Sequence, residues 1–326
     1  MMREILLDHT VPDWVYIRQA LSLALMKNRP ITIAQGMAFL ETCPEYLPLL
    51  DDISTALADR EAGKIIREGD SLSFQPRPIM PGRMCLRSGS LSSAIEILLL
   101  FMPALFHADF RSVIEIDGVT HSPLSYPTPF IKESLLGLLE RLGFFGSLTL
   151  RRFGFHGSGG GFIESRIYPR EGRDGRDIPP IAPALPLGIK IVIARMSTEL
   201  AELEKSILSS TLDFDPEKIA IIEVMDCEGP GNSIQLHVNW GEVTLVLFRE
   251  MRLFNEEGTP YLAEDTMHQE IMGLANDARE LFRKNVLPDG IVRELIPYLG
   301  ISGIEYGLSG EGAVLGLTRD LCSHLL

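Results

Sequence analysis

Cysteine is scarce in this chain and is not arranged for chemistry. The 326 residues contain four cysteines, which lie far apart and form no CxxC pair (Cys43, Cys85, Cys227 and Cys322). Disulfide scaffolds and structural zinc sites need paired or closely spaced cysteines. The sequence indicates neither, and the pattern is typical of a protein kept in the reducing cytoplasm.

Positive charge is also in short supply. The chain has 30 Lys and Arg against 44 Asp and Glu, which gives a net charge of −14 and a pI of about 5.0. Proteins that bind nucleic acid over a broad surface are usually basic, because phosphate neutralisation supplies much of the affinity. We therefore expect no broad, non-specific nucleic-acid binding. A local basic pocket for one phosphate or one RNA end remains compatible with this composition.

Long hydrophobic runs and metal-binding patterns are missing as well. The most apolar stretch, residues 94–108, contains Glu96 and Pro103 and is shorter than the roughly 20 residues of a membrane span, so it predicts a buried helix. Residues 1–8 do not resemble a secretory signal. The histidines show no HExxH-type spacing, and we expect no metal site. His121 could line a cleft, although a surface or capping role is the simpler interpretation.

What the chain does contain is a repeated α/β pattern. Apolar periodicity predicts alternating strands and helices in two stretches that begin about 80 residues apart, which indicates a duplicated unit. In the first, strands are expected at 4–7, 30–33 and 71–74, and helices at 15–26 and 51–62. In the second, strands are expected at 84–87, 112–116, 147–151 and 161–167, and helices at 92–106 and 128–142.

Residues 172–186 form a linker rich in Gly, Pro and charged residues. The segment that follows has a different order of predicted strands and helices. It predicts strands at 187–194, 219–225, 233–238 and 243–249, and helices at 197–209 and 263–283. The remainder, from residue 288, forms a third partial unit.

Several segments, in order along the chain, resemble the RNA 3′-terminal phosphate cyclase family. The main one is Arg151–Gly161, an aromatic-flanked glycine run after an Arg-bearing strand, in which Gly157 replaces the family's usual proline. Arg18 is similar to the arginine that opens the family's first helix. The other matching segments are Ser88-Gly89-Ser90, Pro103–Phe106, Pro129-Phe130-Ile131 and Gly229–Asn232.

The resemblance implies a fold of three βαβαββ-type repeats arranged as a prism, with a smaller α/β domain inserted in the third. The repeat domain would span residues 1–182 and 288–326, with repeats at about 1–80, 81–171, and 172–182 together with 288–326. The inserted α/β domain would span residues 183–287.

The resemblance also implies which positions should carry the catalytic residues of the family, and in this chain other residues occupy them. Family enzymes use ATP to place AMP on a histidine and pass it to an RNA 3′-phosphate. The nucleophile position falls at Val314, and Thr10–Val15 replaces the family's glycine-rich loop. Ala34 and Met37 occupy two phosphate-binding arginine positions, and Leu49-Leu50 replaces a Gln-His pair. We therefore expect a pseudoenzyme that lacks cyclase activity and acts in RNA processing by binding an RNA end or a processing protein.

The remaining candidate anion or RNA contacts are Arg18, Arg151, Arg152, His156, Ser158, Gly159 and Gly160. Each has a simpler explanation. The glycines suit a tight hairpin, and Arg18 could pair with Asp8 or Asp13. The six arginines between 151 and 176 could form a partner or RNA contact, or a solvated face.

Two alternatives stay open at this point. The same cleft could host different chemistry, for which Asp13, Asp51, Asp52, Arg18 and His9 are the groups to watch. A still-active cyclase would need a relocated nucleophile such as His324 or His9. No cofactor is expected, and ATP would be used only if cyclase activity persists. The sequence leaves the oligomeric state undetermined.

Overall fold

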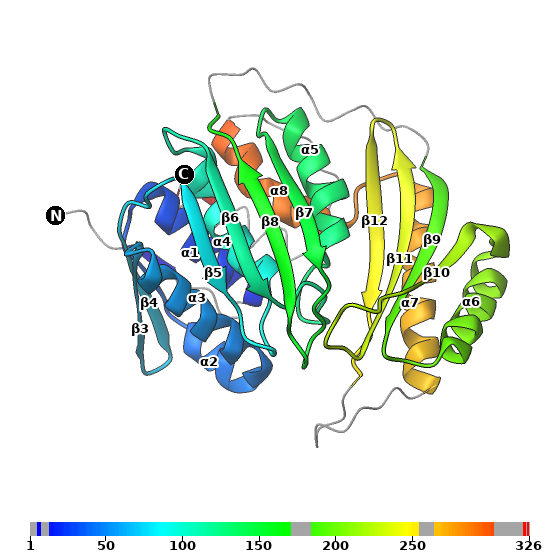
Figure 1. The fold of residues 1–326 in the computed structure, drawn as a ribbon. Coiled ribbons are helices and arrows are strands. Elements are labelled where there is room, and N and C mark those ends of the chain that lie inside the picture. Colours follow the sequence, from blue (N-terminus) through cyan, green and yellow to red (C-terminus); the bar gives the residue numbers. More distant parts are fainter. Residues whose placement is uncertain are drawn as a thin grey trace.

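The computed structural model describes residues 5–7, 13–170, 184–253, 264–302, 322, 323 and 325. It is a mixed α/β protein with three four-stranded sheets side by side (Figure 1). His9, Val314 and His324, and residues 172–183 of the linker predicted at 172–186, lie outside the described residues, whereas residues 185 and 186 already belong to a strand. No described helix is both long and apolar enough to cross a lipid bilayer.

The first unit holds a sheet in the order β1-β2-β4-β3. β1 and β2 are parallel, whereas β4 runs antiparallel to both of its neighbours. The strands are β1 (Ile5–Leu7), β2 (Ile31–Ile33), β3 (Gly63–Glu68) and β4 (Ser71–Pro76), and the helices are α1 (Trp14–Lys27), α2 (Gly36–Thr42), the 3-10 turn η1 (Pro44–Tyr46) and α3 (Leu47–Asp59). α2 and β3 were not expected from the sequence, and α3 begins four residues earlier than predicted.

The second unit repeats the same topology, with the order β5-β6-β8-β7. The strands are β5 (Arg83–Arg87), β6 (Ser112–Gly118), β7 (Gly146–Arg152) and β8 (Gly161–Ile167), and the helical segments are α4 (Ala94–Phe106), η2 (Phe130–Leu135) and α5 (Leu136–Arg141). β5 and β6 are parallel, and β8 pairs antiparallel with both β6 and β7. The predicted duplication is therefore confirmed at the level of strand order and direction.

The third sheet, in the order β10-β9-β11-β12, is built from the block after the linker. Its strands are β9 (Leu185–Ala194), β10 (Ile219–Glu223), β11 (Gly231–Trp240) and β12 (Val243–Glu250), and its helical segments are α6 (Thr198–Leu212), η3 (Pro216–Lys218) and α7 (Glu264–Lys284). α8 (Asp289–Ser302) follows and packs against η2 and α5 of the second unit. All six elements predicted for this block are present.

The core is centred on α1 and α4, which pack against each other. Every residue of α4 is buried, so the apolar stretch is a core helix as predicted. The Ser93 hydroxyl accepts the Ile95 N–H and caps its start.

The helix predicted at 128–142 contains a π-helical turn at η2, where the structure departs from simple α-helical spacing. Contacts to the third sheet account for its position. The Val246 N–H donates to the Ser134 hydroxyl (2.8 Å), and Glu133 pairs with His237 of β11 (2.8 Å). The second unit and the third sheet are thus joined along η2.

Candidate functional site

Arg18, the family-like arginine of α1, is buried between two carboxylates. Its Nε lies 2.8 Å from Glu96 of α4, and its guanidinium also pairs with Glu294 of α8. All three side chains are about 2% exposed. Arg18 therefore pairs with carboxylates as expected, but the described Asp13 is not its partner, and Asp8 lies outside the described residues. The correction arises because α4 and α8 bring distant residues against α1.

Neighbouring polar groups extend this cluster. Asp13 caps α1 by accepting the Tyr16 N–H (2.9 Å), and it pairs with Arg293. The Trp14 indole N–H and the Ser125 hydroxyl each donate to Glu96 (both 2.8 Å). We call the cluster formed by Asp13, Arg18, Glu96, Arg293 and Glu294 the buried ion network. It joins helices from the first unit, the second unit and the C-terminal part of the described chain.

The electrostatics of this network favour a charged Arg18. Burial alone lowers the pKa of Arg18, but the Glu294 and Glu96 carboxylates raise it above its ordinary value. Burial raises the pKa of Glu96, although Arg18 acts in the opposite direction. Removing one partner of a buried pair leaves an uncompensated charge, at a cost of about 3–5 kcal/mol. Arg18 is thus committed to protein carboxylates in this structure.

In the first unit, the residues at the family's other functional positions lie in the hydrophobic core, and the neighbouring carboxylates are paired with nearby groups. Leu49 and Leu50 are buried, and Met37 packs against the same core. Asp51 pairs with Arg67, and Asp52 accepts the Gly89 N–H (2.6 Å). The groups proposed from sequence for new acid–base chemistry, as far as they are described, therefore do not converge on one pocket.

The glycine run after β7 forms a tight turn. A side chain at Gly154 would come within about 2.5 Å of backbone atoms of Gly161 and Gly118, and Gly157, Gly159 and Gly160 have positive φ. The Gly157 N–H donates to Ser90, and the N–H groups of residues 158 and 159 both donate to the Phe155 carbonyl. Because these three donors are used internally, the glycines serve backbone geometry, which is the simpler of the two sequence interpretations.

The structure sets Arg18 apart from the other candidates, whereas Arg152 donates from its Nε to the Gly160 carbonyl of the glycine turn. Arg151 and Arg152 are exposed on the outer face of the second sheet, where they pair with Glu164 (3.1 Å) and lie 3.9 Å from Asp117, respectively. Arg18 lies on the opposite side of that sheet, among the core helices. His156 is half-buried and contacts the Ser122 hydroxyl (3.3 Å). The seven sequence candidates thus do not form a single site.

His121 is buried, which contradicts the surface or capping role favoured from sequence. Its ring stacks on Phe153 (5.1 Å between centroids), and its Nδ1 lies 2.9 Å from the Thr120 hydroxyl. Burial lowers the pKa of His121 to about 3, so the ring is neutral at physiological pH. The bridge between His121 and Phe155 places this histidine inside the glycine turn, where sequence spacing gave no sign of burial.

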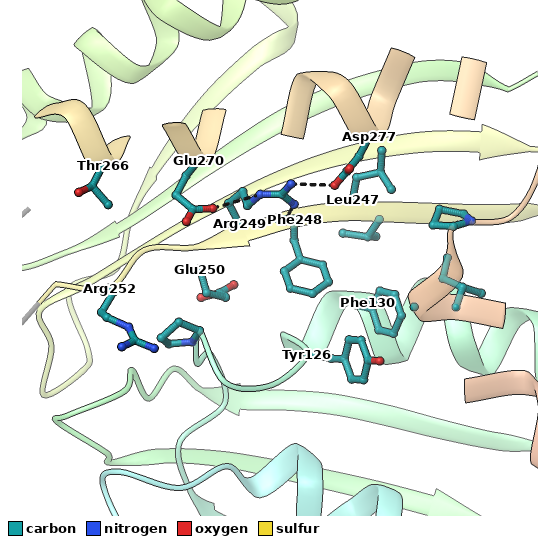
Figure 2. Close-up of a pocket in the computed structure, with 15 residues that line it drawn as sticks. Tyr126, Phe130, Leu247, Phe248, Arg249, Glu250, Arg252, Thr266, Glu270 and Asp277 are labelled. Carbon is teal, nitrogen blue, oxygen red and sulfur yellow. Dashed lines mark hydrogen bonds and ion pairs between the residues drawn. The ribbon is translucent and has the colours of Figure 1, made fainter. Parts of the chain in front are cut away.

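A cleft of about 400 Å³ lies beside β12 and is bordered by residues of η2 and α7 (Figure 2). One wall is aromatic: Tyr126 stacks on Phe130 (4.4 Å between centroids), and Phe248 meets Phe130 edge-on. The opposite side holds Arg249, which is anchored by Glu270 (3.2 Å) and Asp277 (2.7 Å) of α7. Apolar walls with a few oriented polar groups are typical of ligand pockets.

Glu250 is the strongest candidate that the sequence did not indicate. It lines the cleft together with Arg252, and the same two residues border a small adjoining cavity that reaches His121 and His156. Burial raises the pKa of Glu250 to about 8. The hydrogen bond that the Ser233 hydroxyl donates to this carboxyl (2.5 Å) acts in the opposite direction, but burial is the larger effect. A carboxyl group that holds its proton near neutral pH can donate as well as accept hydrogen bonds.

Within the described residues, His, Cys, Asp and Glu side chains form no group of three or more that could hold a metal ion. The chemistry available in the cleft is therefore that of Glu250, the two arginines and the aromatic wall. This arrangement can hold an aromatic ligand and can exchange a proton at Glu250, while Arg249 is engaged by Glu270 and Asp277.

Comparison with known proteins gives the family. The family model described as RNA 3′-terminal phosphate cyclase matches residues 15–185. The RNA 3′-terminal phosphate cyclase of Koribacter versatilis (strain Ellin345) is 28% identical over 224 residues, which cover 68% of this chain and 63% of that protein. The enzyme of the same name from Ectopseudomonas mendocina (strain ymp) is 30% identical over 242 residues, 73% of this chain and 70% of that protein. The resemblance carried by Arg18 and the glycine run is confirmed, and this chain belongs to the RNA 3′-terminal phosphate cyclase family.

Proposed function

We propose that this chain is a family member that does not cyclise RNA 3′ ends and instead serves RNA processing as a binding factor for RNA or a protein. The enclosure of Arg18 by Glu96 and Glu294 carries this proposal. An arginine that is 2% exposed and paired with two carboxylates has no free edge for an RNA or nucleotide phosphate.

The charge of the surroundings supports the same view. The buried ion network sets two cations (Arg18 and Arg293) against three carboxylates (Asp13, Glu96 and Glu294). An added phosphate would meet no net positive charge there, and charge neutralisation is what phosphate binding needs. A nucleotide phosphate therefore does not fit this end of α1. The sequence adds Val314 at the nucleophile position and Ala34 and Met37 at the arginine positions.

A binding role is supported by the cleft beside β12. Its volume of about 400 Å³, its aromatic wall and the Arg252 side chain at its rim are features of a site that accommodates a ligand. The four cysteines are free thiols, which supports a cytoplasmic location.

The test is incubation of the folded protein with ATP labelled on the α-phosphate and an RNA oligonucleotide bearing a 3′-phosphate. We expect neither labelled protein nor a cyclised RNA end. The Ectopseudomonas mendocina cyclase, assayed in parallel, is the positive control for both readouts. Labelled protein together with cyclised RNA would overturn the proposal.

A second candidate is acid–base chemistry in the cleft, and the observation that favours it is the buried position of Glu250 where the cleft meets the cavity that reaches His121 and His156, with burial raising the pKa of Glu250 to about 8. The same labelled reaction can be analysed for nucleotide hydrolysis. Release of labelled AMP or ADP without cyclised RNA, lost in Glu250→Gln and kept in Glu204→Gln, would favour this candidate. Unchanged ATP in all samples would leave binding as the function.

A further inference from the structure

The outer face of the second sheet carries a concentration of arginines in an otherwise acidic chain. The face is formed by β5, β6, β8 and β7, with α4 packed on the opposite side (Figure 1). We call it the arginine face and define it by six exposed residues: Arg83 and Arg87 on β5, Arg111 before β6, Arg151 and Arg152 on β7, and Arg166 on β8. Its four strands contain no lysine.

Strand register brings these residues together from distant parts of the sequence. Val113 pairs with both Arg83 and Arg166, and Asp117 pairs with Arg87. Phe162 is in register with both Asp117 and Arg152. The arginines are therefore spread over neighbouring strands of one surface, which the sequence alone did not reveal.

Two carboxylates of this face, Glu115 and Glu164, lie beneath the arginines, whereas Asp117 is itself 52% exposed. Arg83 pairs with Glu115 (2.7 Å), and Arg151 and Arg166 both pair with Glu164 (3.1 and 2.9 Å). The three arginine side chains are 51–72% exposed, whereas the two glutamates are only 15–16% exposed. A ligand approaching over Arg83, Arg151 and Arg166 consequently meets guanidinium groups before these two glutamates.

The charge balance of the face is positive. Six arginines stand against Glu115, Glu164 and Asp117, and against Asp109 beside Arg111, so the excess is two charges in a chain of net charge −14. A guanidinium has five N–H donors, and one that is paired with a carboxylate can still donate to a phosphate from its other edge.

Hollow space and aromatic groups lie at one end of the arginine face. A depression of about 470 Å³ is bordered by Arg83, Arg111, Arg166 and Tyr168. Tyr168 is 41% exposed, and Phe110, next to Arg111 in the chain, is 71% exposed. Exposed aromatic rings beside arginines provide stacking surfaces for unpaired bases.

The first unit shows that the fold does not require these arginines. The corresponding outer face of its sheet carries Thr32, Ser71, Ser73 and Gln75, and its charged residues, Lys64 and Glu68, balance. Because both sheets have the same topology, the arginines are a property of this surface and not of the architecture.

We propose that the arginine face binds a single-stranded nucleic acid, with the arginines on its phosphates and Phe110 and Tyr168 against its bases. The inference does not rest on the proposed function, since the surface lies on the opposite side of the second sheet from the buried ion network. It is also compatible with the expected lack of broad nucleic-acid binding, because the basic area is local.

The test measures fluorescence anisotropy of a labelled oligouridylate of about 16 nucleotides with a 3′-hydroxyl and no ATP. The 3′-hydroxyl and the omission of ATP keep the assay independent of cyclisation. For a triple variant, Arg83→Gln, Arg111→Gln and Arg166→Gln, we expect binding about tenfold weaker at low salt. The slope of log K against log salt should fall by about 2, since each lost single-strand phosphate contact contributes about 0.7.

The matched control removes the same charge elsewhere. Lys64→Gln, Lys218→Gln and Arg283→Gln are exposed positions away from the face, and this triple variant should bind like the wild type. Equal weakening in both triple variants would reduce the effect to net charge and overturn the proposal, as would wild-type protein that does not bind. Circular dichroism checks that each variant is folded.

The aromatic contribution separates nucleic acid from an acidic protein partner. Phe110→Ala with Tyr168→Ala should weaken oligouridylate binding at least fivefold, within the range of about 1–3 kcal/mol for a stacked base. A polyglutamate peptide of equal charge should compete poorly. Competition as strong as that of unlabelled oligouridylate, together with no effect of the aromatic variant, would overturn the assignment in favour of an acidic protein segment.

Discussion

The first and second units share one topology but use arginine–carboxylate pairs in opposite ways. In the first unit, Arg18 is enclosed by Glu96 and Glu294, and all three side chains are about 2% exposed. In the second, Arg83 covers Glu115 on an open sheet, and its side chain is 72% exposed. The same chemical pair is therefore withdrawn from solvent in one unit and presented to it in the other.

The buried pair contributes to the stability of the fold, whereas the exposed pair is accessible to a ligand. A buried pair is costly to break because the remaining charge has no solvent, whereas an exposed pair contributes about 0–1 kcal/mol. The third sheet adds a third setting, in which the buried carboxyls of Glu204 and Glu250 are held by the uncharged side chains of Asn232 and Ser233. Each setting makes a different prediction about charge and stability.

The largest effect is expected at Arg18. Arg18→Met leaves two buried carboxylates without their cation, and we expect the free energy of unfolding to fall by about 3–5 kcal/mol in urea denaturation. The triple variant Arg18→Met, Glu96→Leu and Glu294→Leu should recover most of this loss, because it removes the charges together. A loss below about 1 kcal/mol for Arg18→Met would show that the network is not desolvated and would remove the contrast between the units.

The next effect concerns pH and the third sheet. The pKa of Glu250 is about 8 in the folded state against an ordinary 4.5, so the folded protein binds a proton that the unfolded chain releases between those values. Stability conferred by this group is therefore lost as pH rises from about 4.5 to 8. Relative to Glu250→Gln, the wild type should lose roughly 2–4 kcal/mol between pH 5 and 8 in urea titrations. A constant difference between the two proteins across that range would contradict the shift.

The smallest effect on stability is expected on the arginine face. Arg83→Gln should lower the free energy of unfolding far less than Arg18→Met does, since the pair it breaks is exposed to solvent. The measurement is the same urea denaturation used for Arg18→Met. A loss as large as that of Arg18→Met would mean that the arginines of the second sheet are structural, and the proposed binding surface would lose its main support.

Much of the fold could be predicted because its signals are local. The period of apolar residues in 94–108 predicts the buried helix α4, and alternation in 161–167 predicts β8, both of which are present. The duplication follows because each unit repeats the same local pattern. β3 was missed since Gly63–Glu68 is half-exposed along its length and shows no clear alternation between buried and exposed positions.

The candidate site was less accessible from sequence, because its contacts join distant residues. Asp13 was proposed for Arg18 on sequence proximity, yet it pairs with Arg293, and Arg18 pairs with a carboxylate 276 positions away. Glu250 gave no signal, since a glutamate at the end of a strand is ordinary until tertiary packing buries it. Family resemblance located the arginines at 151 and 152, but only strand register shows that their sheet also carries Arg83 and Arg166.

The buried ion network also imposes an order of events on synthesis. Glu294 leaves the ribosome 276 residues after Arg18, which corresponds to roughly 14–55 s at about 5–20 residues per second. During that interval α1 and α4 can pack, but Arg18 has only Glu96 as a partner. Arg293 and Glu294 arrive together and add no net charge, so a nascent chain truncated before α8 would lack the second carboxylate of Arg18 and the cation that pairs with Asp13.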